Sequence, residues 1–349
     1  MTQHGTTHLP ELKGMTLPEL ETLFATLGEP RYRADQAASW LFTRGVSDIS
    51  EMSNLSKALR QKLAGAATVA SARAVAHERS SIDGTEKLLL EFEGTGDRIE
   101  AVVLLDDDRR TGCISSQVGC RFACRFCATG AMGLTRSLTA GEIVEQILAL
   151  RRIVAPERLN NLVYMGMGEP FDNYNEVMRS VRIANAPWGL GIGARRMTIS
   201  TSGVAPGIRR LAGEGLQINL AVSLNAPIQE LREHLMPIAA KYPLDELLDA
   251  LRQFNHEVGR LITLEYVLLR GINDSPEMAT LLGDIAAELF CRVNLICYNE
   301  IAEVAYAPPT DETVSRFMTA LRRRCPTVVR RISRGSDISA ACGQLHTRS

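Results

Sequence analysis

The sequence lacks a long hydrophobic run, a large net charge and a leader-like N-terminus. Each absence argues against a class of protein. No stretch approaches about 18 consecutive apolar residues, the length that indicates a membrane-spanning helix, so we expect no membrane partner. The formal net charge of −1 excludes a globally basic nucleic-acid-binding protein, although it says nothing of local patches. The first residues show no charged segment followed by an apolar one, so we expect a cytoplasmic protein.

Internal repeats and low-complexity segments are also lacking, which argues against solenoid and disordered architectures. The 349 residues, 45% of them hydrophobic, are enough for one large domain, one small domain and a sizeable core. In a chain of this size without a secretory signal, the cysteines are not expected to form a disulfide framework. There are eight of them, at positions 113, 120, 124, 127, 291, 297, 325 and 342.

The first 66 residues predict a compact helical module. A capping box at Thr16 and Glu19 precedes apolar residues at helical spacing, and further helices are expected near 34–43 and 55–63. Residues 67–110 change character, because the Asp83-Gly84 dipeptide lies between two stretches that are typical of strands. We expect a strand-rich connector there, in the form of a short antiparallel extension.

Residues 111–349 predict an α/β domain in which strands and helices alternate. Six βα units without a doubly wound order indicate a partial (β/α)6 barrel, which binds ligands at the C-terminal ends of its strands. The expected strands are Cys113–Ser116, Asn161–Met165, Arg196–Thr201, Gln217–Ser223, Leu261–Leu268 and Val293–Tyr298.

Three cysteines with C-x3-C-x2-C spacing are the strongest chemical signal. Cys120, Cys124 and Cys127 can bind three irons of one [4Fe–4S] cluster, which leaves the fourth iron open to a small molecule that chelates through an amine and a carboxylate. A structural zinc site would need a fourth ligand. The spacing resembles the signature of the radical S-adenosylmethionine (SAM) superfamily, in which the open iron binds SAM.

Polar residues at the predicted strand ends suggest a ligand pocket. Gly168 and Glu169 follow the second strand in a glycine-rich turn, which exposes backbone groups and a carboxylate that can accept from an ammonium group. This turn resembles the GGE-type motif that binds the SAM amine in radical SAM proteins. Further candidates for the pocket are Ser200, Ser223, Leu224, Asn225 and Asn299.

Two cysteines outside the triad complete a family pattern. Cys113 precedes the triad by seven residues, and Cys342 lies in the near-terminal segment Ala-Ala-Cys-Gly-Gln-Leu. Together with the triad, Met165-Gly-Met-Gly-Glu-Pro170 and Thr198-Ile-Ser-Thr-Ser-Gly203, these segments resemble the RlmN/Cfr family of radical SAM RNA methyltransferases, RlmN more than Cfr. The resemblance covers nearly the whole chain, from about Leu17 to Leu345.

The resemblance implies methylation of an adenine ring carbon, C2 of an adenosine in 23S rRNA and possibly in tRNA. Cys342 would carry the methyl group from one SAM, and a second SAM on the open iron would provide the radical. Glu100 would accept the ring proton, and Cys113 would form a transient disulfide with Cys342 that releases the product.

The resemblance also implies partners. The helical module would contact RNA, an electron donor such as flavodoxin or ferredoxin would reduce the cluster, and the chain would act as a monomer. Asn225 stands where the family usually has histidine, so its ribose contact is in question. Arginines near the motif loops are candidates for phosphate contacts: Arg121, Arg125, Arg136, Arg195, Arg196, Arg209 and Arg210.

Three alternatives remain open from the sequence. A Cfr-type enzyme would methylate adenine C8 in 23S rRNA and give antibiotic resistance. A non-catalytic Fe–S protein that binds RNA would not need Cys342 or Cys113. A zinc-binding module would be colourless, whereas a four-iron protein would be brown.

Overall fold

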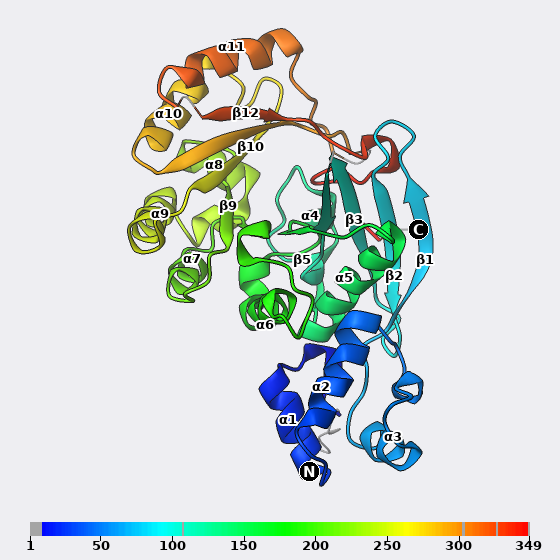
Figure 1. The fold of residues 1–349 in the computed structure, drawn as a ribbon. Coiled ribbons are helices and arrows are strands. Elements are labelled where there is room, and N and C mark those ends of the chain that lie inside the picture. The colour runs from blue at the N-terminus through cyan, green and yellow to red at the C-terminus, as the bar shows by residue number, and fades with distance from the viewer. Residues whose placement is uncertain (1–8, 107, 302–303, 326, 348–349) are drawn as a thin grey trace, which may run out of the picture.

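The computed structural model describes residues 9–106, 108–301, 304–325 and 327–347. Within these residues, ten strands form one sheet in the order β1-β2-β3-β4-β7-β8-β9-β10-β11-β12 (Figure 1). Neighbouring strands are antiparallel from β1 to β4 and parallel from β4 to β12. The strands are β1 Ala72–Arg79, β2 Glu86–Phe92, β3 Arg98–Asp106, β4 Arg109–Cys113, β7 Asn161–Tyr164, β8 Met197–Thr201, β9 Asn219–Ser223, β10 Ile262–Leu268, β11 Cys291–Cys297 and β12 Val328–Arg331.

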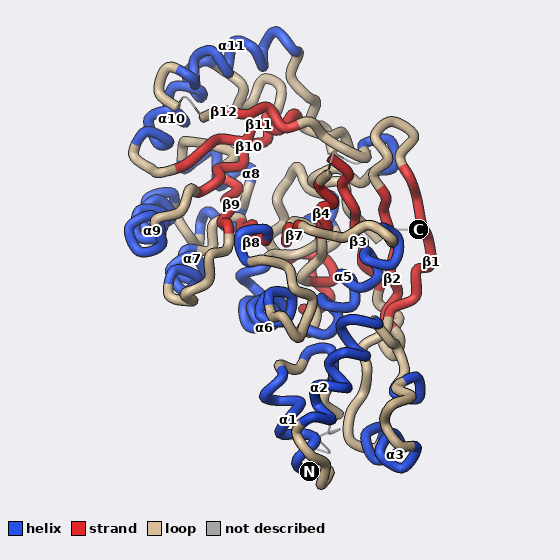
Figure 2. The backbone as a smooth tube through the Cα atoms, viewed as in Figure 1, coloured by secondary structure: helices blue, strands red, loops and turns tan. Residues whose placement is uncertain are grey.

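Helices cover the outer face of the parallel strands, which line the interior (Figure 2). The predicted α/β partial barrel is therefore confirmed, and five of its six strands lie within two residues of their predicted bounds. The strands alternate between apolar and polar residues: in β11, Val293 and Leu295 are buried in the main core, whereas Arg292 and Asn294 between them are more exposed. The helices are α5 Ala140–Val154, α6 Tyr174–Asn185, α7 Ala205–Ala212, α8 Gln229–Leu235, α9 Leu244–Val258, α10 Pro276–Ala287 and α11 Asp311–Arg322.

The first barrel strand differs from its prediction. We expected Cys113–Ser116, whereas β4 ends at Cys113. The reason is that the Ser115 backbone bonds with a side chain in place of a neighbouring strand: its amide donates to Gln146 Oε1 at 2.8 Å, and its carbonyl accepts from Gln146 Nε2 at 3.0 Å. The sequence also gave no indication of β12, whose four residues include two arginines and show no apolar alternation.

The N-terminal helices form a module with its own hydrophobic cluster, and they are α1 Leu17–Thr26, α2 Tyr32–Ala38 and α3 Lys57–Ala64. Val144 and Leu148 of α5 and Ile183 of α6 complete that cluster, so the module packs directly on the barrel. The divisions at 66/67 and 110/111 stay predictions, and β4 extends across the second.

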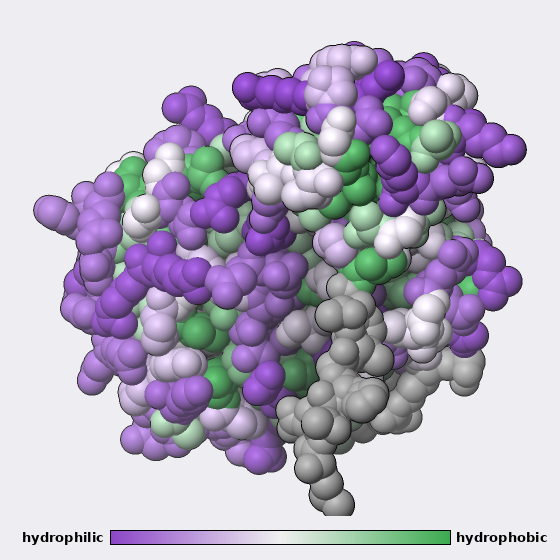
Figure 3. Space-filling model, turned by 90° about the horizontal axis from the view of Figure 1, so that it is seen from below, coloured by the Kyte–Doolittle hydropathy of each residue, from purple (hydrophilic) through white to green (hydrophobic). Residues whose placement is uncertain are grey.

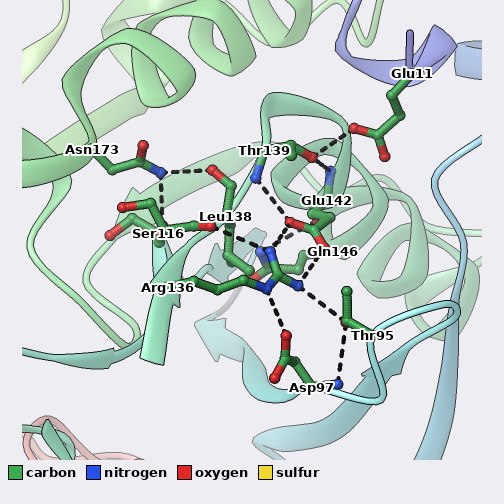
Figure 4. Close-up of polar contacts among 11 residues, drawn as sticks. Glu11, Thr95, Asp97, Ser116, Arg136, Leu138, Thr139, Glu142, Gln146 and Asn173 are labelled. Carbon is green, nitrogen blue, oxygen red and sulfur yellow. Dashed lines mark hydrogen bonds and ion pairs between the residues drawn. The ribbon is translucent and has the colours of Figure 1, made fainter. Parts of the chain in front are cut away.

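Arg136 lies at the junction between the barrel and the antiparallel extension (Figure 4). Its guanidinium donates to Asp97 Oδ2 at 2.6 Å and to both oxygens of Glu142 at 2.7 Å. These carboxylates raise the pKa of Arg136, with Glu142 the main cause. Arg136 was a candidate for an RNA phosphate contact, but the structure uses its charge to join the extension to the first turn of α5.

Within the described residues, no helix is long and apolar enough to cross a membrane. On the face seen from the side of the N-terminal module, hydrophilic residues predominate and hydrophobic ones form small separate groups (Figure 3). This face therefore shows no broad apolar patch of the kind that marks a large hydrophobic interface.

Glu11 lies against Thr139, the residue before α5, and makes the stability of the chain depend on pH. Its carboxylate accepts from the Thr139 hydroxyl at 2.6 Å, and burial raises its pKa from 4.5 to about 7, with a smaller contribution from Glu142. Because the folded chain binds this proton more tightly than the unfolded chain, the stabilisation is complete below pH 4.5 and is lost as the pH rises through about 7. In thermal melts from pH 4.5 to 8, we expect the Tm of the native chain to fall by about 2–4 °C as the pH rises. The Glu11→Gln variant should not show this fall. Parallel pH profiles for the two proteins would contradict this.

Candidate active site

The cysteine triad lies on a tight loop between β5, Gln117–Cys120, and α4, Ala128–Ala131. β5 pairs with β6, Gly133–Ser137, and Cys120 lies opposite Gly133. A Cβ at Gly119 would lie 1.9 Å from the Gly133 carbonyl oxygen, and one at Gly130 would lie 3.0 Å from the Cys124 amide nitrogen. The two glycines that flank the triad are therefore required by close backbone packing.

The three thiols form one electrostatically coupled group. Burial raises the pKa of Cys120 to about 12 and raises those of Cys124 and Cys127, and the neighbouring thiols contribute in the case of Cys120 and Cys124. Yet among the described residues no three His, Cys, Asp or Glu side chains are arranged to bind one metal ion. A four-iron cluster places its three thiolates on three different irons, so the sulfurs need not converge on one point. The donor set thus fits a cluster better than a zinc ion.

A cavity of about 170 Å³ lies at the C-terminal ends of the barrel strands, and we call it the mouth cavity. The triad lines one side of it, and Cys342 also reaches it. The residues predicted for SAM that line it are Gly168, Glu169, Ser200, Ser223 and Asn225.

Glu169 is the buried carboxylate of the mouth cavity. Its Oε2 accepts from the amide and the hydroxyl of Ser202, at 2.8 and 2.6 Å, and its own amide donates to Gln117 Oε1 at 3.0 Å. Burial raises its pKa, and the hydrogen bonds from Ser202 oppose the rise. The adjacent Gly168 has a φ of 96°, and a Cβ there would lie 2.6 Å from the Gln117 side chain, so only glycine fits. A carboxylate fixed in this way is suited to accept from an ammonium group.

Three predicted SAM residues also make contacts within the protein. Asn225 lines the mouth cavity, but it is only 1% exposed, and its Oδ1 accepts from the Val267 amide at 2.9 Å, so this oxygen holds β10. Leu224 is fully buried in the main core. Asn299 donates to the Cys342 carbonyl at 3.1 Å and thus orients the catalytic candidate itself.

Cys113 and Cys342 line a second cavity of about 460 Å³, which we call the floor cavity. Both are free thiols, and Cys113 is 8% exposed. Burial raises the pKa of Cys113 to about 12, and Cys342 is the second cause of the rise. The structure thus brings together two cysteines that are 229 positions apart in the sequence, and only Cys342 also lines the mouth cavity.

Arg331 and Glu265 line both cavities beside these cysteines, and sequence reasoning missed them. Cys342 is the main cause of a raised pKa of Arg331, followed in the same direction by Glu265. Glu265 Oε1 accepts from Asn294 at 3.1 Å, whereas its buried Oε2 has no hydrogen-bond partner in the part of the chain that the structure describes. Glu265 could have been identified as a candidate site residue because it is the acidic residue of an otherwise mostly apolar strand. The sequence around Arg331 gave little indication of a functional role.

Glu100 lies on the other side of the C-terminal segment. Its Oε1 is 3.0 Å from Lys87 Nζ, and its Oε2 accepts from the His346 amide at 2.8 Å. Burial raises its pKa, and Lys87 opposes the rise. Among the described residues, Glu100 lines a separate cavity of about 320 Å³ and neither the mouth nor the floor cavity. Its role as the proton acceptor stays a prediction.

Comparison with known proteins agrees with this site. Residues 10–69 match the family model of the ribosomal RNA large subunit methyltransferase N-terminal domain, and residues 114–282 match the radical SAM superfamily. A probable dual-specificity RNA methyltransferase RlmN of Symbiobacterium thermophilum is 45% identical, with 97% of this chain and 91% of that protein covered. A dual-specificity RNA methyltransferase RlmN of Geobacter sulfurreducens is 44% identical over 96% of this chain and 91% of that protein.

A solved structure supports the same assignment. The crystal structure of a radical SAM methyltransferase from Sphaerobacter thermophilus superposes with a TM-score of 0.93, at 45% identity, over 97% of this chain and 99% of that one. Similarity of this extent covers the helical module, the antiparallel extension and the barrel alike. The chain belongs to the RlmN family of radical SAM RNA methyltransferases, as its motifs predicted.

Proposed function

We propose that the enzyme methylates C2 of an adenosine in 23S rRNA, and an adenosine in tRNA, through a methyl group carried on Cys342. The observation that supports this most directly is the position of Cys342. It lines the mouth cavity beside the triad and Glu169, and it lines the floor cavity beside Cys113. The Cys342 thiol thus lies between a cofactor site and a second thiol, Cys113, that can release the product from it. The two RNA classes are proposed because the relatives are named dual-specificity enzymes.

The radical SAM family implies a [4Fe–4S] cluster and SAM. Cys120, Cys124 and Cys127 would bind one cluster, Glu169 would accept from the SAM amine, and Ser200 and Ser223 would add hydroxyls that line the mouth cavity. When bound, this pair supplies one-electron chemistry that activates an otherwise inert C–H bond. Two SAM molecules would be used in each turnover, one as methyl donor.

The chain's own part in the reaction starts and ends at Cys342. Its thiolate takes the methyl group as a nucleophile, and the Arg331 guanidinium stabilises the thiolate charge. Asn299 fixes the Cys342 backbone, so the sulfur stays between the two cavities. Once the carbon carried by Cys342 is bonded to the base, the Cys113 thiolate would attack the Cys342 sulfur; the S–S bond forms as the bond from that sulfur to carbon breaks, and the released carbon takes a proton to complete the methyl group.

Glu100 is proposed as the group that removes the ring proton. It is a buried carboxylate with a raised pKa, which suits a base that operates near neutral pH. Because the His346 amide donates to it, the C-terminal segment that carries Cys342 must shift before Glu100 can act. Lys87 keeps the carboxylate charged until then.

The remaining partners follow from this function. The N-terminal module would contact RNA, the adenine would leave its stack to enter the mouth cavity, and a flavodoxin- or ferredoxin-type donor would supply electrons to a monomeric enzyme.

Mass spectrometry of nucleosides tests the proposal. Ribosomal RNA and tRNA from a strain without the gene, treated with the enzyme, SAM and a reductant, are expected to gain 2-methyladenosine. Reactions without SAM provide the control. An 8-methyladenosine product without 2-methyladenosine would contradict the C2 assignment and indicate the Cfr-type reaction.

A further inference from the structure

The floor cavity lies at the opposite end of the barrel from the mouth cavity. Its lining includes residues at the beginning of the strands, such as Asn161 of β7, Thr263 of β10 and Val329 of β12. The mouth cavity is lined instead by residues at strand ends, such as Thr201 and Ser223. The two cavities meet at Cys342, so the redox cysteines have an approach that does not pass the cluster and SAM.

The floor cavity leads from the surface to the cysteines. Its rim includes Val329, which is 50% exposed, and Ile332, which is 78% exposed, whereas Ala341 and Cys113 at its inner end are buried. The C-terminal segment closes the gap between β12 and β3, where Arg334 donates to Asp106 at 2.8 Å (Figure 1). A volume of about 460 Å³ falls within the range of small-ligand pockets and is too small for a protein domain.

Positive charge dominates the lining of the floor cavity. Among the described residues, neither Arg292 nor Arg331 forms an ion pair within 4.0 Å, and the Arg292 Nε donates only to the Thr263 hydroxyl, at 3.0 Å. A lumen with low-dielectric walls focuses such a field and favours anions. Five arginines line the cavity, Arg109, Arg292, Arg330, Arg331 and Arg334, against two carboxylates, Asp106 and Glu265.

The proposed function leaves Cys113 and Cys342 joined by a disulfide that must be reduced before the next turnover. We propose that the floor cavity admits a small thiol that carries an anionic group, such as a carboxylate. This thiol reduces the disulfide from the side opposite the cofactors. The inference rests on the proposed function, because that function creates the disulfide. It adds a second entrance to the enzyme and the chemical class of the molecule that uses it.

The direction of attack follows from the lining. Both cysteines line the floor cavity, but only Cys342 lies beside Arg331 in the lining of both cavities, where a cation favours it as the leaving thiolate; the incoming thiolate therefore attacks the Cys113 sulfur and the S–S bond breaks. A second thiolate attacks the mixed disulfide on Cys113. The external thiols depart as their own disulfide, and Cys113 takes a proton from water. Two electrons pass from two thiols to one disulfide, and Cys342 is left ready to accept a methyl group.

The test measures reduction of the disulfide and not methylation. Holoenzyme is taken through one turnover with SAM, RNA and a donor that contains no thiol, and the linked Cys113–Cys342 peptides are quantified by mass spectrometry. It is then treated with 2-mercaptoethanesulfonate, 2-mercaptoethanol or cysteamine. For each thiol, the rate of disulfide reduction is divided by the fraction of that thiol present as thiolate. It is also divided by the rate at which the same thiol reduces an exposed model disulfide, which corrects for intrinsic reactivity. We expect the anionic thiol to react about tenfold faster than the cationic one.

Two matched pairs of variants locate the entrance. Arg292→Gln should reduce the preference for the anionic thiol at least twofold, whereas Arg323→Gln, at the exposed residue that follows α11, should leave it unchanged. Val329→Trp at the rim should slow all three thiols, whereas Ile82→Trp, an exposed residue outside the cavity, should not.

Each contrary outcome has a distinct meaning. Equal normalised rates for the three thiols, or rates that Arg292→Gln and Val329→Trp leave unchanged, would overturn the entrance while the proposed function stands. If only a protein dithiol, and none of the three small thiols, reduced the disulfide, the entrance would likewise be overturned while the proposed function stands. Failure to form the Cys113–Cys342 disulfide in turnover would overturn both.

Discussion

Replacing Cys342 with alanine is expected to abolish methylation, whereas replacing Cys113 with alanine is expected to trap RNA on the protein. Loss of Cys342 would remove the proposed methyl acceptor, and removal of a covalent nucleophile lowers rates on the order of 10³-fold or more. Loss of Cys113 would leave the earlier steps intact but remove the thiol proposed to break the link to the base. The two variants should therefore fail differently, although both cysteines line the same cavity.

Denaturing gels with labelled RNA, together with nucleoside analysis, distinguish the two failures. Cys113→Ala should give a covalent RNA–protein band, and Cys342→Ala should give neither band nor product. Cys297→Ala is the matched control, because this free cysteine lies on β11 outside both cavities and should retain activity. Methylated product from Cys342→Ala would exclude a methyl-cysteine route, and a non-catalytic protein would give no band with any variant.

Gly119→Ala is expected to prevent cluster loading although it changes no cysteine. Gly119 has a φ of 78°, and an added Cβ would lie 1.9 Å from the Gly133 carbonyl oxygen. The left-handed backbone alone costs a residue with a side chain about 1–2 kcal/mol. The clash with a backbone atom adds to this cost and must push β5 away from β6, which displaces Cys120 at the end of β5.

Gly133→Ala separates the two effects. Gly133 has a φ of 73° on the facing strand, but a Cβ there would meet nothing within 4 Å. It should therefore share the backbone strain and keep the cluster. Iron content and visible absorption after anaerobic reconstitution are the measurements, and we expect several-fold less iron in Gly119→Ala than in Gly133→Ala. Equal loading would show that the β5–β6 contact does not position the triad.

Much of the fold could be predicted because its signals are local. Alternation of strands with capped helices predicted the barrel, and the capping box expected at Thr16 and Glu19 is present at the start of α1. The errors occurred where tertiary contacts replace local preference. Ser115 leaves the strand because Gln146 and the Glu100 carbonyl satisfy its polar groups, and β12 forms by pairing with β11 despite a sequence with little strand character.

The site was predictable to the extent that its chemistry is carried by motifs. The triad, Glu169 and the two outer cysteines were found from spacing and resemblance, and the structure places them around two connected cavities. Asn225 lines the mouth cavity as predicted, but its contact with the Val267 amide could not be foreseen because that amide lies on another strand. Glu265 and Arg331 belong to no motif, and they gain importance only because the sheet folds them inward beside Cys342.

The sequence by itself determined the ligand chemistry, because three thiols at fixed spacing and two distant cysteines carry their reactivity in their atoms. Only the tertiary structure decided which residues share a cavity and from which side each is reached. Pairing of β4 with β7 and closure by the C-terminal segment bring Cys113 to Cys342, and the same closure places Glu100 behind that segment. These contacts join residues that are far apart in the chain, and burial and packing, which no local pattern records, select them.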